Sequence, residues 1–180
     1  GSDHQMEFCS GVTGIGASDE TMTFSEIMLV VNGDMLFTST IKFYGDCLIQ
    51  GRGCSLNLLN AYLDVTAGAT VRFVDVELLD IKDTTFIFGD SSSTIRFSNA
   101  VIRLTEDVTF DNSGLIYADG RTRVVCPGCD WAFNGDSLLT VSNCTMWLDG
   151  VDVSAGSVSG NLSMINSGTI KEVTSGYHVS

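Results

Sequence analysis

A ten-residue pattern recurs along this chain: apolar, any, apolar, any, then Asn, Asp or Gly, with a further apolar residue three positions later. Its best copies begin at Ile95 and Leu139 and end on a leucine, Leu104 and Leu148. Alternation with a period of two places the first and third side chains on one face of a strand. Asn, Asp and Gly tolerate a left-handed backbone, so the fifth position can bend the chain sharply. The pattern therefore predicts two short strands joined by a bend, with their apolar side chains in one interior.

The spacing of the copies distinguishes a coil from a set of hairpins. Eight copies are found, beginning at Leu29, Ile41, Leu56, Val71, Ile95, Val108, Leu139 and Leu162. Five of them, those at 29, 71, 95, 139 and 162, are separated by multiples of roughly 22 residues, a period typical of solenoids. The other three begin too close to a neighbour for a full coil. We interpret these as other strand–bend–strand corners or as accidental matches.

An antiparallel β-sandwich or barrel is the competing interpretation. Its tight hairpins would use Asn-Gly or Asp-Gly turns. Such dipeptides begin at Asn32, Asp119, Asn134 and Asp149. The coil is favoured because one pattern repeats at one offset over most of the chain.

The polar fifth position resembles the Asn-containing bends of the right-handed parallel β-helix superfamily, which includes autotransporter passengers, phage tailspikes and pectate-lyase-like enzymes. No motif specific to one of these families accompanies the resemblance. It implies an all-β solenoid of about seven rungs. It also implies a ladder of turn residues at Asn60, Asp75, Asn99, Asn112, Asn143 and Asn166. We expect a tag remnant and N-terminal cap over 1–28, the β-helix over 29–170, and a C-terminal cap or truncation point over 171–180.

The charge balance excludes several classes of partner. The chain has 22 Asp and Glu against nine Lys and Arg, a formal net charge of −13. A nucleic-acid partner would need a basic stripe, and an anionic lipid surface would repel this chain. No apolar run approaches the roughly 18–20 residues of a membrane-spanning helix. We therefore expect neither a nucleic-acid partner nor membrane insertion by this segment.

Four of the six cysteines lie in two close pairs. Cys126 and Cys129 flank the only proline in the segment Cys-Pro-Gly-Cys. A redox centre would place this motif at a helix N-terminus, and no helix is predicted after it. Cys47 and Cys54 are spaced more widely than zinc ligands usually are. We interpret all four as thiols or disulfide partners, and disulfides would indicate an extracellular setting.

Candidate catalytic groups are few. The two histidines, His4 and His178, lie near the ends of the sequence, which disfavours imidazole triads and His-rich metal centres. An acidic cluster could support sugar cleavage, and its members are Asp75, Glu77, Asp80 and Asp83. However, the Asp-Asp, Gly-His-Gly and Arg-Ile-Lys groups of pectin-degrading enzymes do not occur. We assign no catalytic residue, no metal ligand and no cofactor.

Three residues are candidates for contact with a partner. Arg72 and Arg96 share the second, outward position of the pattern, so we expect them on neighbouring rungs, facing either acidic neighbours or an anionic partner. Trp147 occupies an outward position, where an exposed ring favours a contact surface.

We expect a non-enzymatic structural or adhesive surface module that presents loops to a protein or glycan partner, located extracellularly, on a cell surface or on a virion. The alternatives are a polysaccharide-acting β-helix enzyme that uses carboxylates, and a self-assembling β-helix module that forms homo-oligomers.

Overall fold

The computed structural model describes residues 4–8, 14–17, 20–110, 114–133, 138–149, 152–155, 158–165, 170–173 and 177–179. All regular secondary structure in these residues is β-strand. The strands stack in parallel as a solenoid, so the predicted fold class is confirmed. The antiparallel sandwich or barrel is excluded, because the strand pairs are parallel.

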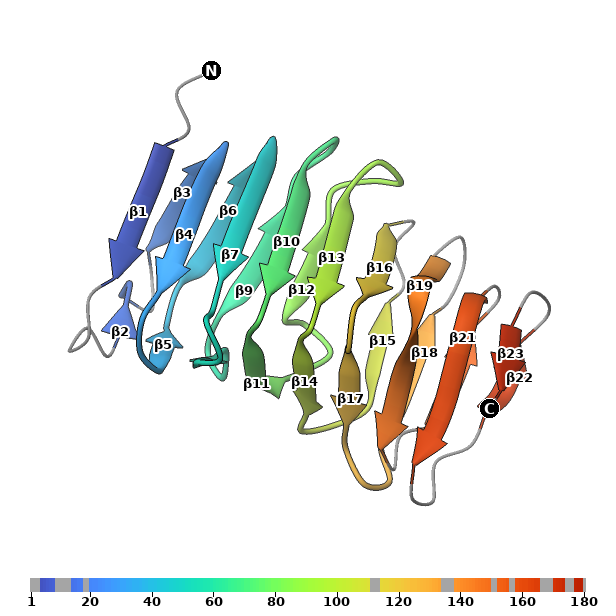
Figure 1. Ribbon diagram of the computed structural model, residues 1–180. Coiled ribbons are helices and arrows are strands. Elements are labelled where there is room, and N and C mark those ends of the chain that lie inside the picture. The colour runs from blue at the N-terminus through green and yellow to red at the C-terminus, as the bar shows by residue number, and fades with distance from the viewer. Residues whose placement is uncertain are drawn as a thin grey trace.

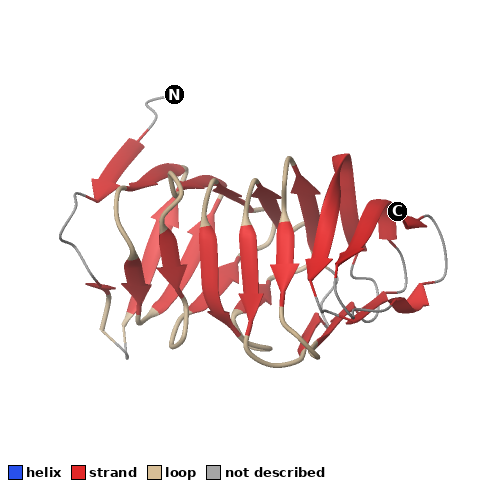
Figure 2. Cartoon of the chain, turned by 60° about the horizontal axis from the view of Figure 1, so that its bottom comes forward, coloured by secondary structure: helices blue, strands red, loops and turns tan. Residues whose placement is uncertain are grey.

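Each turn of the coil has three sides (Figures 1 and 2). The first side contains β1 (His4–Phe8), β4 (Ile27–Val31), β7 (Asp46–Gln50), β10 (Thr70–Val74), β13 (Thr94–Ser98) and β16 (Leu115–Asp119). The second side contains β2 (Gly14–Ile15), β5 (Met35–Phe37), β8 (Ser55–Asn57), β11 (Glu77–Ile81), β14 (Val101–Leu104) and β17 (Arg123–Val125).

The third side consists of two four-stranded sheets. One contains β3 (Thr21–Ser25), β6 (Thr40–Tyr44), β9 (Tyr62–Val65) and β12 (Phe86–Phe88). The other contains β15 (Val108–Phe110), β18 (Asp130–Phe133), β20 (Asp152–Ala155) and β22 (Ile170–Val173). Two longer strands, β19 (Leu138–Asp149) and β21 (Val158–Ile165), continue from the first side into the second, and β23 (Tyr177–Val179) pairs with β21.

The coil is right-handed. In Figure 1 the strands of the first side lie in front and run downwards, while those of the third side lie behind and run upwards. The chain advances from left to right as it winds, which is the sense of a right-handed coil. Crossovers between parallel strands are almost always of this hand, because strand twist favours it.

The strand register follows the predicted period. Val71 pairs with Cys47 and with Ile95, 24 residues away in each direction, and Ile95 pairs with Ile116, 21 residues further on. The closely spaced copies of the pattern lie on the other two sides: Ile41 on β6 and Val108 on β15 of the third side, and Leu56 on β8 of the second. Their short spacing reflects passage around a single turn.

The regular coil has about five turns, each with three separate strands. This is slightly fewer than the seven or so rungs that the β-helix resemblance implies. Beyond β18 the turns shorten: Met146 pairs with Leu162, only 16 residues later. A turn of that length has too few residues for three strands and three corners, so β19 and β21 run across one corner.

The predicted end segments contain strands of the coil. Residues 1–28 include β1, β2 and β3, which pair with β4, β5 and β6. Residues 171–180 include the end of β22 and the strand β23. Both ends of the described chain therefore contribute edge strands.

Inward side chains from the three sides fill a continuous apolar core. Phe73 and Phe97, paired on neighbouring strands, stack with ring centroids 5.7 Å apart. Phe86 from the third side meets both rings edge-on, at 6.5 and 6.1 Å. Offset-stacked and edge-on arrangements are the favoured geometries of aromatic pairs. The core therefore ties each turn to the next on more than one side.

The corner between the first and second sides carries a ladder of polar side chains. Asp75 and Asn99 lie there on successive turns with left-handed backbones, at φ 50° and 51°. Asp75 accepts hydrogen bonds from Gln50 Nε2 at 2.9 Å and from Asn99 Nδ2 at 3.2 Å, and Asn99 Oδ1 accepts one from the Arg121 N–H at 2.9 Å. Each bond joins one turn to the next, so the bend residues also connect the turns.

Replacement of Asp75 tests this ladder. Asp75→Ala loses two inter-turn hydrogen bonds to a carboxylate and places a Cβ-bearing residue with no side-chain acceptor at a left-handed position. We expect a loss of about 2–4 kcal/mol in the free energy of unfolding. Asp75→Gly removes the same bonds but suits the backbone, so it should lose about 1 kcal/mol less. Urea denaturation followed by circular dichroism measures both, and an Asp75→Ala variant as stable as the parent would contradict the role of the ladder.

Candidate interaction face

The outward side of the first sheet carries a row of aligned side chains. Pairing places Met28 beside Leu48, Leu48 beside Arg72, Arg72 beside Arg96, and Arg96 beside Tyr117. We call these five residues the arginine row. Neighbouring members lie on adjacent strands, about 4.8 Å apart along the coil. The row therefore changes from apolar to cationic to aromatic along the axis.

The two arginines of the row are weakly neutralised. The nearest carboxylate to Arg72 is that of Asp46, with Nη2 and Oδ2 4.0 Å apart, and the Arg72 side chain is 52% exposed. The Arg96 guanidinium carbon lies 4.7 Å from the centroid of the Tyr117 ring, a cation–π contact. Among the described residues Arg96 forms no ion pair. Like charges directly opposite each other on neighbouring strands are destabilising, so this pair does not serve stability.

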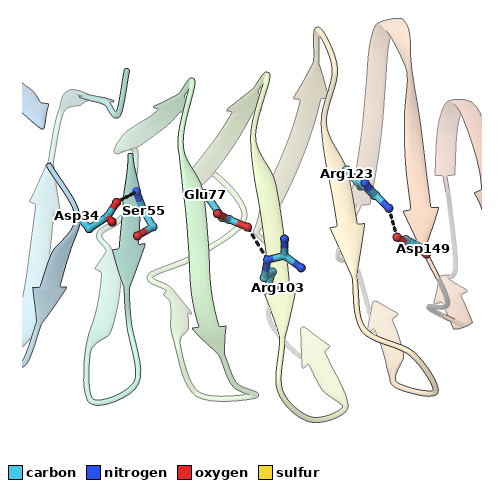
Figure 3. A network of polar contacts seen from close by, with 6 residues as sticks. All are labelled: Asp34, Ser55, Glu77, Arg103, Arg123 and Asp149. Carbon is cyan, nitrogen blue, oxygen red and sulfur yellow. Dashed lines mark hydrogen bonds and ion pairs between the residues drawn. The ribbon is translucent and has the colours of Figure 1, made fainter. Parts of the chain in front are cut away.

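Several other cations of the described chain pair with carboxylates across turns. Lys42 lies 3.4 Å from Asp64. Arg103 pairs with Glu77, and Arg123 pairs with Asp149 (Figure 3). The arginine row therefore differs from these pairs in having a cation beside a cation.

A shallow groove of about 310 Å³ lies along the two arginines. It is lined by Arg72, Val74, Arg96, Ser98 and Asp119. Asp119 Oδ1 is buried and has no hydrogen-bond partner in the described part of the chain. The groove thus combines two guanidinium donors with a hydroxyl and a carboxylate at one edge.

The acidic residues expected as a cluster lie apart, each with its own partner. Asp75 belongs to the corner ladder, Glu77 pairs with Arg103 and Asp80 accepts a hydrogen bond from Asn57 Nδ2. Asp83 Oδ1 accepts the Thr109 N–H at 2.6 Å. The structure therefore uses these four carboxylates to hold neighbouring turns together.

Further aspartates, which the sequence did not single out, act in the same way. Asp34 Oδ1 accepts the Ser55 N–H at 2.8 Å (Figure 3), and this bond holds the pKa of Asp34 below its usual value. Asp107 Oδ1 accepts the Asp130 N–H at 2.8 Å. Each of these aspartates lies about one period before the residue whose N–H it accepts. That spacing is the signal from which the sequence could have predicted them.

The other expected ladder residues have different positions. Asn60 lies in the turn between β8 and β9, at another corner from Asp75 and Asn99. Asn112, Asn166 and the side chain of Asn143 lie outside the described residues. Asn32, expected from the sequence only as part of a candidate hairpin turn, donates to Glu7 at 2.6 Å and accepts from Arg52 at 2.7 Å at the corner shared by Asp75 and Asn99.

Only the backbone position of Trp147 is described. It lies on β19 and pairs with Arg123 on β17, on the second side of the coil. Its side chain lies outside the described residues.

The Cys-Pro-Gly-Cys segment forms a tight turn between β17 and β18. The Cys129 N–H donates to the Cys126 carbonyl at 3.2 Å, and Gly128 has φ 87°. Proline followed by a positive-φ glycine is typical of a type II turn. The turn brings the two sulfurs together as a disulfide. Cys47 is a buried thiol whose pKa is raised by burial, and Cys54 is a partly exposed thiol.

Peptide mapping tests the assignment of the disulfide. Alkylation of the unfolded chain without reductant should modify Cys47 and Cys54 and leave Cys126 and Cys129 unmodified. After reduction all four should react. Fragment mass spectra that place alkyl groups on Cys126 or Cys129 in the unreduced sample would contradict the disulfide.

Comparisons with protein-family models, with curated proteins and with solved structures found no significant match. Within the described residues, no group of three or more His, Cys, Asp or Glu side chains is arranged to hold a metal ion. The same part of the chain contains no helix of sufficient length and apolarity to span a membrane.

Proposed function

We propose that this chain is a non-enzymatic structural and adhesive module that binds an anionic group of a protein or glycan partner through the arginine row. The carrying observation is the in-register pair Arg72 and Arg96, which lies side by side on an exposed sheet with little neutralisation. An extracellular, cell-surface or virion location accompanies this proposal, because disulfides such as Cys126–Cys129 persist in oxidising compartments.

The scaffold supports this function by fixing the spacing of the two guanidinium groups. Val71 and Phe73 flank Arg72 and are buried, as Ile95 and Phe97 are around Arg96. Such anchoring orders the backbone beneath the groove before a partner arrives. Preorganisation of this kind reduces the entropy lost on binding.

The chemistry of the row favours carboxylate or sulfate ligands. Guanidinium groups form paired hydrogen bonds to two oxygens of one oxyanion, which a single ammonium does not. Tyr117 orients Arg96 by its cation–π contact. Met28 and Leu48 extend the row with apolar surface. The row therefore suits a partner with an acidic group beside an apolar one.

The net charge of −13 adds selectivity. At physiological ionic strength the Debye length is about 8 Å, so distant carboxylates act weakly on a group already in the groove. A large polyanion such as a nucleic acid brings many of its charges close to the acidic surface outside the row and is repelled there. An anionic group of a partner is therefore attracted only where it contacts the arginine row.

A charge-matched pair of variants tests the proposal. Arg72→Gln/Arg96→Gln should weaken binding to a short sulfated or uronic oligosaccharide immobilised on a surface plasmon resonance chip by about tenfold or more, because each guanidinium provides a charge-assisted hydrogen bond. The control Arg52→Gln/Arg103→Gln removes the same charge from residues that already have carboxylate partners, Glu7 and Glu77. It should retain binding.

Two results would oppose the proposal. Equal losses in the two double variants would indicate a general charge effect. The second result is a parent chain that binds neither the sulfated ligand, nor the uronic ligand, nor an acidic protein surface. That result would contradict the proposal that the arginine row binds an anionic group.

Self-assembly is a second candidate, favoured by edge strands of the described chain. In the described chain β1, β2 and β3 each pair with one strand only. Met6 pairs with the inward-facing Leu29 and is itself 42% exposed. Open edges and uncovered apolar side chains favour addition of another β-strand.

Light scattering across a range of concentrations tests self-assembly. The parent should show masses that are multiples of 19.3 kDa as the concentration rises. Met6→Glu should shift the distribution to the monomer, because it places a charge on the end of the core. A parent that stays at the monomer mass at every concentration would exclude this candidate.

A further inference from the structure

A second hollow lies on another part of the coil, away from the arginine row. Two tight turns, residues 58–61 and 82–85, lie on successive turns of the solenoid, where the second side meets the third. Each is closed by a hydrogen bond, from the Ala61 N–H to the Leu58 carbonyl at 3.1 Å and from the Thr85 N–H to the Lys82 carbonyl at 3.0 Å. A cleft of about 340 Å³ separates them.

Backbone bonds hold the walls of the cleft in place. The Leu58 N–H donates to the Leu79 carbonyl at 3.0 Å before the first turn, and the Leu63 N–H donates to the Thr85 carbonyl at 2.7 Å after it. Leu58 and Leu63 are themselves buried in the core. The cleft is therefore a fixed feature of the coil.

Two large side chains flank the cleft without contributing to the core. Leu59 is 43% exposed and Tyr62 is 45% exposed, and both line the hollow. The Asn57 side chain positions the backbone here, since its Oδ1 accepts the Leu59 N–H at 2.9 Å. An apolar side chain and an aromatic ring thus border one hollow that is open to solvent.

Polar groups lie around the same hollow. Asn60, Lys82 and Thr84 line it, and in the described structure their side chains form no hydrogen bond or ion pair. They offer an amide, an ammonium and a hydroxyl. Thr85 differs, because its hydroxyl accepts the Lys82 N–H at 2.9 Å and serves the turn.

We propose that the cleft between residues 58–61 and 82–85 binds a neutral saccharide. A sugar ring has an apolar face that can pack on Tyr62 and Leu59, and a rim of hydroxyls that can pair with Asn60, Lys82 and Thr84. Binding sites for small ligands combine apolar surface with a few placed polar groups in this way. A neutral ligand is favoured over an acidic one because Asp83 lies within the second turn and Asp80 lies two residues before it.

Nuclear magnetic resonance titration with neutral oligosaccharides of glucose, mannose, galactose and N-acetylglucosamine tests this site. Titration with at least one of them should shift the backbone amides of Asn60, Ala61, Tyr62 and Thr84. Tyr62→Ala should weaken that binding by about tenfold through loss of ring packing. Asn60→Ala should weaken it by about fivefold through loss of a hydrogen bond.

Tyr44→Ala is the matched control. Tyr44 also lies on the third side and is 43% exposed, but it does not line the cleft, so its replacement should leave the affinity unchanged. The Arg72→Gln/Arg96→Gln variant should also retain saccharide binding, which keeps this site distinguishable from the arginine row. Absence of binding by all four sugars, equal affinity in Tyr62→Ala, or equal loss in Tyr44→Ala would overturn the proposal.

Discussion

The parallel register between successive turns is the constraint on which this structure depends. Backbone hydrogen bonds set Val71 between Cys47 and Ile95, and the same register aligns every inward side chain of the first side. A slip of one residue would turn the apolar set outward and the polar set inward. Burial of one face therefore specifies the register strongly, and the outward rows follow from it.

Polar corners reinforce that register. Asp34, Asp83 and Asp107 each accept a backbone N–H from the next turn, and Asp75 joins the side chains of Gln50 and Asn99. These bonds use carboxylates that in an acidic chain would otherwise only repel one another. The same arrangement leaves Arg72 and Arg96 side by side on an exposed sheet, with a single ion pair to Asp46 at 4.0 Å among the described residues, and the proposed function rests on this pair.

Much of the fold could be predicted from the sequence because its two periods are local properties. Alternation of two marks strands, as in Ile95–Phe97, and the spacing of about 22 residues marks a coil. The turn count was wrong because the sequence pattern persists through β19 and β21, where shorter turns merge two strands into one. The hydrogen-bond partners of the corner residues could not be predicted either, because they depend on which corners of successive turns lie side by side.

By itself the sequence determined that the chain is a parallel β-solenoid, and the shared second position of Arg72 and Arg96 predicted them on neighbouring rungs. Only the tertiary structure decided that Tyr117 follows them, that Asp46 lies at the limit of ion-pair distance, and that Leu59 and Tyr62 border a cleft. The physical reason is that the identity of a neighbour across turns depends on the exact length of every intervening turn. These lengths vary, as the 24- and 21-residue steps around Ile95 illustrate.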